Sequence, residues 1–342
     1  MRFVFNYLVH FYCRVPLNPK KIRGKVYMKK IAFIILIVCN LSNPCWSQPP
    51  ESSKPIKIIL SNWTSQVVLS KIIGKIYLKM GYKIEYQTVS IDKQWGLLHR
   101  GLADVQVEVW EGTMTVMFEK MIQKGGVVCA GDHDAKTREE WWYPAYLEKV
   151  CPGLPDWKAL KRCYKLFITP KTAPKGMYLG GPWEKPDMAR IRALNMNFEI
   201  VRAKNGDELW RKLDKAIKEQ TPIVIFNWSP NWVEAKYDGK FVEFPDYDPA
   251  CEVNPKWGMN PDLPYDCGNP KDGWLKKAAS SVMETQWPCA FNTFKSFNFS
   301  NQMIAELALW VDINKMSYDA AAEKWLEKNA STWKSWIPDK CQ

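Results

Sequence analysis

The sequence predicts an α/β protein with two lobes, each built on a mainly parallel sheet flanked by helices, with a hinge between the lobes. Short apolar strands alternate with amphipathic helices over residues 56–109, and a second alternation of this kind covers residues 166–226. Strands that alternate with helices form βαβ units, and these units build parallel sheets. A length of 342 residues is large for one core and ordinary for two lobes that share a cleft.

The first unit contains three predicted strands and two predicted helices, distinguished by the spacing of their apolar residues: strand 56–60, helix 68–80, strand 83–89, helix 92–100 and strand 105–109. Apolar residues three and four apart indicate a helix, whereas strict alternation indicates a half-buried strand. Gly81 ends the first helix because glycine readily adopts the C-terminal capping conformation. From residue 140 the pattern becomes irregular, and residues 151–155 form a connection.

The second unit is read from the same signals: strand 166–170, turn 180–183, strand 197–201, helix 207–219 and strand 223–226. A region rich in Pro, Asp, Asn and Gly follows, and helices at 301–312 and 318–327 end the chain. These elements divide the chain into four predicted parts: an N-terminal extension with signal peptide (1–47), the first part of lobe 1 (54–150), lobe 2 (151–238), and a return to lobe 1 with the C-terminal helices (239–342).

The N-terminal part has the features of a secretory signal peptide. Lys29 and Lys30 precede an apolar run at 31–38, and a short polar stretch ends at Ser47, where we expect cleavage. The apolar run is too short to span a bilayer. Met28 directly precedes the basic pair and is an alternative start of the chain. We therefore expect an exported protein, with a retained amphipathic anchor as the alternative.

The basic charge of the chain is concentrated in this N-terminal part. Residues 1–47 hold 8 of the 48 Lys and Arg residues and no acidic residue, so the net charge of +12 falls to about +4 without them. The remaining basic residues form no run of five or more. A basic stripe that would follow a phosphate backbone is thus not visible, and the sequence predicts no nucleic-acid partner.

Cysteine and histidine usage argues against a zinc site or a catalytic centre. The chain after residue 47 has no Cys-x-x-Cys pair, and His99 and His133 belong to no visible nucleophile–base arrangement. The sequence therefore predicts a binding protein rather than an enzyme. Cys251 and Cys267 bracket a polar loop, and in an oxidising compartment we expect them to form a disulfide.

The loop between these two cysteines concentrates oxygen-bearing side chains. Asn260, Asp262 and Asp266, together with loop carbonyls, are candidate ligands for a structural Ca²⁺, which takes six to eight oxygens. The spacing does not match the EF-hand loop, and simple Asx-turns explain the same composition. No cofactor is required for chemistry.

Tryptophan is the unusual component, with 18 residues against 14 Tyr and 14 Phe. Six of the tryptophans follow predicted strands or lie in turns and connections: Trp63, Trp110, Trp141, Trp142, Trp183 and Trp228. Open α/β sheets bind ligands at the carboxyl ends of their strands. Aromatic faces attract cations, and a methylated ammonium is their usual guest. We therefore predict an aromatic cage for such a group, with core packing and sugar stacking as the alternatives.

Glu111 directly follows one of these tryptophans at a strand end. Inside an aromatic cage its carboxylate would balance a cationic guest, or accept a proton from a protonated N-oxide. A surface salt bridge is the alternative role.

Five stretches of the chain together resemble one known family: Val109-Trp110-Glu111, residues 140–146, Gly181-Pro182-Trp183, residues 226–232, and the Trp325, Trp333 and Trp336 pattern. With these residues the chain resembles the substrate-binding proteins of glycine betaine/choline-type ABC importers over nearly all of its mature part. The resemblance implies a monomeric, periplasmic binding protein of the two-lobed type II fold. It also implies that the lobes close on a methylated ammonium compound, which is then delivered to an ABC permease and its ATPase subunits.

Carried over to this sequence, the resemblance assigns Trp110, Trp183 and Trp228 to the tryptophan box, with Trp63 and Trp141 or Trp142 as further walls. Glu111 and the cysteine-bracketed loop depart from the betaine pattern and are closer to the trimethylamine N-oxide-binding branch, which is similar in having a Glu beside the box and a bound calcium. We therefore favour trimethylamine N-oxide and keep choline and glycine betaine open. A secreted carbohydrate-binding or hydrolytic protein is the alternative function, and a structural envelope protein is a third.

Overall fold

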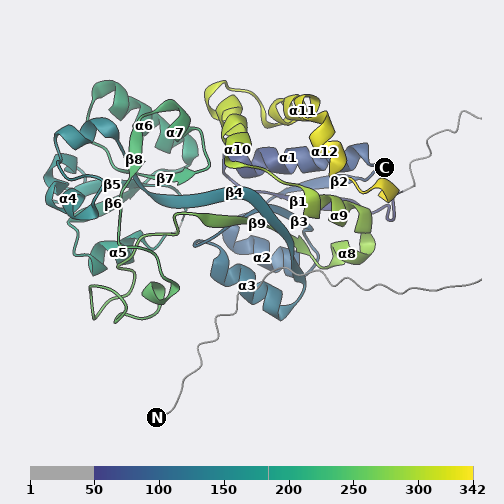
Figure 1. Cartoon of the computed structure of the whole chain (residues 1–342), viewed down its shortest axis with the longest axis horizontal. Coiled ribbons are helices and arrows are strands. Elements are labelled where there is room, and N and C mark those ends of the chain that lie inside the picture. The colour runs from purple at the N-terminus through teal and green to yellow at the C-terminus, as the bar shows by residue number, and fades with distance from the viewer. Residues whose placement is uncertain (1–49, 184, 342) are drawn as a thin grey trace, which may run out of the picture. The chain divides into compact units, whose positions relative to one another are not determined.

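The computed structural model describes residues 50–183 and 185–341, and a continuous path of hydrogen-bonded strands runs through them (Figure 1). The predicted signal peptide lies outside these residues. Within the described part the strands are β1 (Ile56–Leu60), β2 (Ile84–Thr88), β3 (Val105–Trp110), β4 (Val127–Pro144), β5 (Gly176–Gly180), β6 (Phe198–Arg202), β7 (Ile225–Ser229), β8 (Gly239–Phe241) and β9 (Gly273–Ser280). Their order is β2-β1-β3-β9-β4-β7-β5-β6, and β8 pairs with β4.

Strand β4 belongs to two groups of strands. Its residues 127–137 pair with β9, whereas its residues 138–142 pair with β7. We call β2-β1-β3-β9 with the start of β4 the first half, and the end of β4 with β7-β5-β6 the second half. β1 pairs in parallel with β2 and β3, and β5 pairs in parallel with β6 and β7. The strands β4 and β9 add antiparallel pairs, so the sheet is mixed.

Helices cover both faces of the first half and flank the second. The described helices are α1 (Thr64–Lys79), α2 (Ile91–His99), α3 (Thr115–Lys124), α4 (Trp157–Arg162), α5 (Asp187–Ala193), α6 (Gly206–Glu219), α7 (Val233–Lys236), α8 (Val282–Gln286), α9 (Pro288–Ser296), α10 (Asn301–Ala308), α11 (Tyr318–Lys328) and α12 (Ala330–Ser335). Figure 1 shows α1, α10 and α11 on one face of the first half, with α2 and α3 on the opposite face. Among the described residues, no helix has the length and apolarity needed to cross a membrane.

Local capping explains where several helices begin. The side chain of Asn205 accepts a hydrogen bond from the Glu208 N–H at the start of α6, and Ser317 caps α11 in the same way through the Ala320 N–H. Asp207 and Glu208 in the first turn of α6 complement the positive end of the helix dipole. These caps explain why α6 and α11 begin at these residues.

The predicted α/β fold class is confirmed, but four of the described strands, β4, β5, β8 and β9, were not predicted. In β4, His133, Ala135 and Thr137 are buried while the residues between them are exposed. Buried and exposed residues alternate as in a strand, but the buried positions include polar residues, so the apolar pattern does not show this alternation. In β9 a buried lysine, Lys277, has the same effect.

The strand predicted at 166–170 is wrong. Residues Tyr164–Phe167 form a 3-10 turn, and β5 begins only at Gly176. Pro170 lies in this stretch, and a proline cannot donate a hydrogen bond to a sheet.

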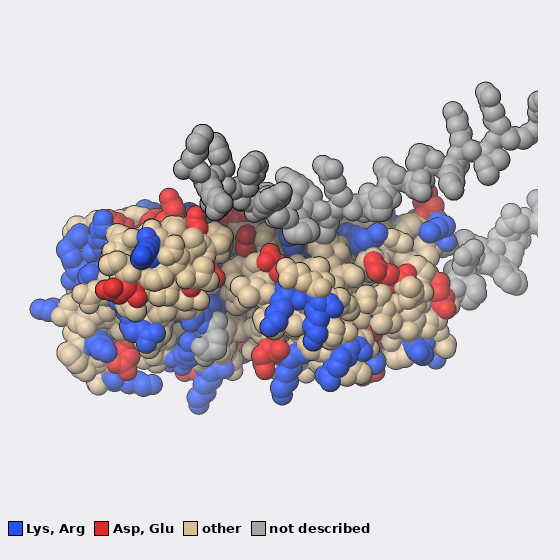
Figure 2. Space-filling model, turned by 90° about the horizontal axis from the view of Figure 1, so that it is seen from below, with Lys and Arg blue, Asp and Glu red and all other residues tan. Residues whose placement is uncertain are grey.

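Three disulfides are present in the described part of the chain: Cys151–Cys163, Cys251–Cys267 and Cys289–Cys341. The second is the pair expected from the sequence. On the face shown in Figure 2, basic and acidic side chains are interspersed.

Candidate ligand-binding site

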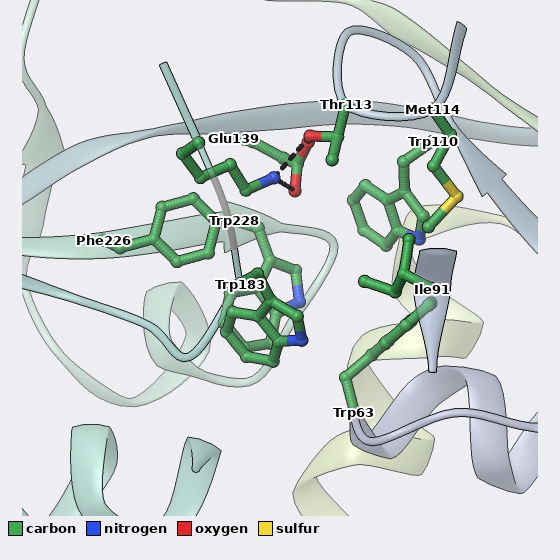
Figure 3. Close-up of a pocket in the computed structure, with 10 residues that line it drawn as sticks. Trp63, Ile91, Trp110, Thr113, Met114, Glu139, Trp183, Phe226 and Trp228 are labelled. Carbon is green, nitrogen blue, oxygen red and sulfur yellow. Dashed lines mark hydrogen bonds and ion pairs between the residues drawn. The ribbon is translucent and has the colours of Figure 1, made fainter. Parts of the chain in front are cut away.

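One pocket gathers four of the six candidate tryptophans (Figure 3). The side chains that line it are Trp63, Ile91, Trp110, Thr113, Met114, Glu139, Trp183, Lys185, Phe226 and Trp228. We call it the tryptophan pocket. Figure 3 shows Trp63 and Trp110 on one side of the pocket and Trp183 and Trp228 on the other. The first pair belongs to the first half and the second pair to the second half, so both halves supply walls.

Each tryptophan is positioned by the end of a regular element. Trp63 is the N-cap residue of α1, Trp110 is the last residue of β3, and Trp228 lies near the end of β7. Trp183 follows β5 after a turn that requires glycine. A Cβ atom at Gly181 would lie 2.4 Å from the Trp183 ring, so only glycine lets this indole fold back over the turn.

The rings on the second side support one another. The centroids of Trp183 and Trp228 are 5.2 Å apart with planes at 86°, which is the edge-to-face arrangement that aromatic pairs prefer. Trp210 packs behind Trp228 at a centroid distance of 5.0 Å. This packing supports the wall on the second side of the pocket.

A buried carboxylate, Glu108, holds the two rings on the first side. Its Oε2 atom accepts hydrogen bonds from Trp63 Nε1 at 2.5 Å, from Trp110 Nε1 at 3.0 Å and from Ser65 Oγ at 3.1 Å. Burial raises the pKa of Glu108 to about 7, although these hydrogen bonds lower it. Since both indoles donate to one oxygen atom, Glu108 fixes their relative orientation.

The N–H group of a third indole also donates a hydrogen bond within the protein. Trp183 Nε1 donates to Asn62 Oδ1 at 3.0 Å, which links the second half to the first. With three indole N–H groups engaged in this way, the walls offer mainly ring faces to a ligand.

The polar groups of the pocket meet at one end. The Glu139 carboxylate pairs with the Lys185 ammonium, and the Thr113 hydroxyl donates to Glu139 and accepts from Lys185. The side chains of Lys185 and Glu139 are 7% and 14% exposed. Lys185 Nζ also lies 5.0 Å from the centroid of the Phe226 ring. The pocket thus joins an aromatic cage to a largely buried ion pair.

Trp141 and Trp142 do not line this pocket. Both are in β4 and fully buried, and Trp141 stacks on Tyr178 with ring centroids 3.8 Å apart. Trp141 Nε1 donates to Asp187 Oδ1 at 2.8 Å. These two rings pack in the core of the second half, because the end of β4 is covered on both faces.

Glu111 also lies outside the tryptophan pocket. Its Oε2 atom accepts a hydrogen bond from the Trp274 N–H at 2.8 Å, and its side chain borders a separate polar cavity of about 340 Å³. That cavity shares Thr113, Glu139 and Lys185 with the tryptophan pocket. The carboxylate that lines the tryptophan pocket is therefore Glu139 and not Glu111.

The sequence analysis missed Glu108, Glu139 and Lys185. One signal was available for the first: Glu108 lies two residues before Trp110 in β3, so the two side chains share a face of the strand. A carboxylate on a strand that is buried throughout indicates a specific partner. Glu139 lies in β4, a strand that the sequence analysis did not predict.

Two of the three predicted calcium ligands, Asn260 and Asp266, accept hydrogen bonds within their own loop. Asn260 Oδ1 accepts hydrogen bonds from the N–H groups of Asp262 and Leu263, and Asp266 Oδ2 accepts from the Asn260 N–H at 2.8 Å. The contacts of Asn260 Oδ1 have the geometry of an Asx-turn. The described residues contain no group of three or more His, Cys, Asp or Glu side chains arranged for a metal ion. Calcium binding stays a prediction.

Comparison with solved structures shows the fold. A glycine betaine/L-proline-binding protein of Borrelia burgdorferi superimposes with a TM-score of 0.67 at 22% identity, covering 84% of this chain and 98% of that one. A choline-binding protein of an ABC transporter in complex with choline gives a TM-score of 0.67 at 17% identity, over 84% and 94% of the two chains. The fold is that of type II periplasmic substrate-binding proteins.

Comparison of sequences defines the family. The chain belongs to the substrate-binding domains of ABC-type glycine betaine transport systems, which match residues 54–328. A trimethylamine N-oxide-binding protein of Pelagibacter ubique is 37% identical over 317 residues, or 90% of this chain and 98% of that protein. A glycine betaine/carnitine transport binding protein of Listeria monocytogenes is 24% identical over 124 residues, covering 36% and 34%.

Proposed function

We propose that the protein binds trimethylamine N-oxide in the tryptophan pocket and delivers it to an ABC permease. The observation that carries the proposal is the set of four indoles on opposite sides of one pocket that ends in a carboxylate. The similarity to a trimethylamine N-oxide-binding protein at 37% identity supports the same ligand.

The chemistry of the walls suits a methylated ammonium group. Methyl groups bound to a positive nitrogen donate no strong hydrogen bonds, so the group is stabilised by ring faces. A sugar needs many hydrogen-bond partners, yet Trp63, Trp110 and Trp183 already donate their N–H groups to the protein. The pocket therefore favours the methylated amine over the carbohydrate alternative.

Glu139 takes the role that the sequence analysis gave to Glu111. A ligand carboxylate placed beside Glu139 would be repelled, whereas the positive nitrogen of a neutral N-oxide would be attracted to it. Trimethylamine N-oxide fits this end of the pocket better than glycine betaine.

The two-lobed division supports a closing motion. In our proposal the lobes are those expected from the sequence, residues 54–150 with 239–342 and residues 151–238, except that the end of β4 and β8 belong to the second lobe. The lobes close around the ligand as hinge-type binding proteins do. The protein works as a monomer in the periplasm, with the permease and its ATPase subunits as partners.

Isothermal titration calorimetry of the mature chain with trimethylamine N-oxide, choline, glycine betaine and carnitine tests this proposal. We expect a single site with micromolar or tighter affinity for trimethylamine N-oxide and weaker affinity for the other three. Heat with none of the four compounds would refute the proposal, and preference for another compound would change the ligand.

A further inference from the structure

The pocket contains a cation of its own. The Lys185 ammonium contacts Glu139 and Thr113 and lies 5.0 Å from the Phe226 centroid, and its side chain is only 7% exposed. These partners come from different parts of the chain: β4, the segment after β3, and β7. Lys185 is therefore held in place at the polar end of the aromatic cage.

This lysine changes the charge balance that a ligand meets. Glu139 alone would make the pocket negative and favour any cation. With the lysine beside it, the ammonium offsets this attraction, so the pair gives a cationic ligand no net electrostatic advantage. The ion pair thus removes the preference for net cations that Glu139 alone would create.

An N-oxide has the complementary charge distribution. It is neutral overall, with a positive nitrogen among its methyl groups and a negative oxygen at one end. The nitrogen suits the ring faces, and the oxygen suits an ammonium donor, because charge-assisted hydrogen bonds are stronger than neutral ones. Choline has the same trimethylammonium head but only a hydroxyl group in place of the anionic oxygen.

We propose that Lys185 is a specificity-determining residue, which donates a hydrogen bond to the N-oxide oxygen and disfavours net cations such as choline. The inference rests on the proposed function, because it assigns a role within the same pocket. It concerns the ratio of two affinities rather than the affinity for one ligand.

The test compares trimethylamine N-oxide and choline binding by calorimetry in the wild type, Lys185→Met and Lys185→Gln. Both variants remove the charge while keeping a chain of similar length, and circular dichroism checks that each is folded. Lys204→Met, which removes one exposed lysine outside the pocket, is the matched control for net charge.

We expect both Lys185 variants to bind trimethylamine N-oxide about tenfold more weakly and choline at least threefold more tightly, since Glu139 is then unbalanced. The control should keep the wild-type ratio. If the variants shift both affinities by the same factor, or weaken choline more, Lys185 does not set specificity. A wild type that binds neither compound would instead refute the proposed function.

Discussion

Replacing Glu108 with Gln removes a buried ionisable group while preserving the shape of the side chain that holds two walls of the pocket. Burial raises the pKa of Glu108 from its ordinary 4.5 to about 7. Below pH 4.5 the carboxyl group is protonated in both the folded and the unfolded chain. Between 4.5 and 7 the unfolded chain loses this proton while the folded chain keeps it, so rising pH favours unfolding. Above pH 7 both states are ionised and the loss is complete.

The expected change in the free energy of unfolding follows from the pKa values of Glu108 in the unfolded and folded chain. A difference of one pKa unit corresponds to about 1.36 kcal/mol, so the contribution of Glu108 to the free energy of unfolding should fall by about 3 kcal/mol between pH 4.5 and 8. Glu108→Gln has no such contribution. The variant should therefore gain about 3 kcal/mol relative to the wild type over this range.

Urea unfolding of both proteins at pH 4.5, 6 and 8 measures this gain. Asp104 and Asp312, whose pKa values burial also raises to about 6, are present in both proteins, so their effects cancel in the difference. A difference that stays within about 0.5 kcal/mol at all three pH values would refute the reasoning.

Glu108→Leu is the companion variant for binding. The amide oxygen of Gln still accepts from Trp63 and Trp110, whereas Leu leaves both indole N–H groups without an acceptor. An unsatisfied buried donor costs about 1–3 kcal/mol. Ligand affinity should thus survive in the Gln variant and fall in the Leu variant, as calorimetry would show, and equal affinities would contradict the role of Glu108.

Three further predictions concern the pocket and the loop. Trp228→Ala should weaken trimethylamine N-oxide binding at least tenfold in calorimetry, because one cation–π wall contributes about 1–2 kcal/mol in addition to its packing; wild-type affinity would place the site elsewhere. Glu139→Gln should weaken binding about tenfold while Glu111→Gln changes it less than threefold, and the reverse order would restore the expectation from the sequence. Cys251→Ser should lower the free energy of unfolding by about 3 kcal/mol, because Cys251–Cys267 closes a loop with a separation of 16 residues; unchanged urea unfolding would show that the bond adds nothing.

The sequence was sufficient for elements whose apolar spacing is regular. The run from β1 to β3 was predicted within one or two residues at most boundaries, except that α1 begins four residues before its predicted start. β4 and β9 were missed, because His133, Thr137 and Lys277 face inward and are satisfied by contacts that no local pattern reveals. His133 Nδ1 accepts from the Phe299 N–H at 3.1 Å, from a residue 166 positions away.

In the site, too, local sequence patterns identified some residues, whereas long-range contacts placed the others. Trp63, Trp110, Trp183 and Trp228 were found because strand ends converge at one edge of a sheet. Trp141 also belongs to an aromatic run, but its pairing with Phe226 of β7 and its stacking on Tyr178 place it in the core. Such pairing is a long-range property.

The roles of Glu108, Glu111 and Glu139 depend on which face of a strand each occupies and on which half of the sheet it reaches. Glu108 shares the face of Trp110, whereas Glu111 is one residue past the strand and bonds to Trp274. Glu139 reaches the pocket only because β4 passes from the first half to the second.

A crystal structure of the protein grown with saturating trimethylamine N-oxide tests the central claim most directly. The account predicts the ligand nitrogen within about 6 Å of the ring centroids of Trp63, Trp110, Trp183 and Trp228, with its oxygen directed toward Lys185 and Glu139. A ligand bound outside these four rings, or an empty tryptophan pocket at saturation, would contradict it.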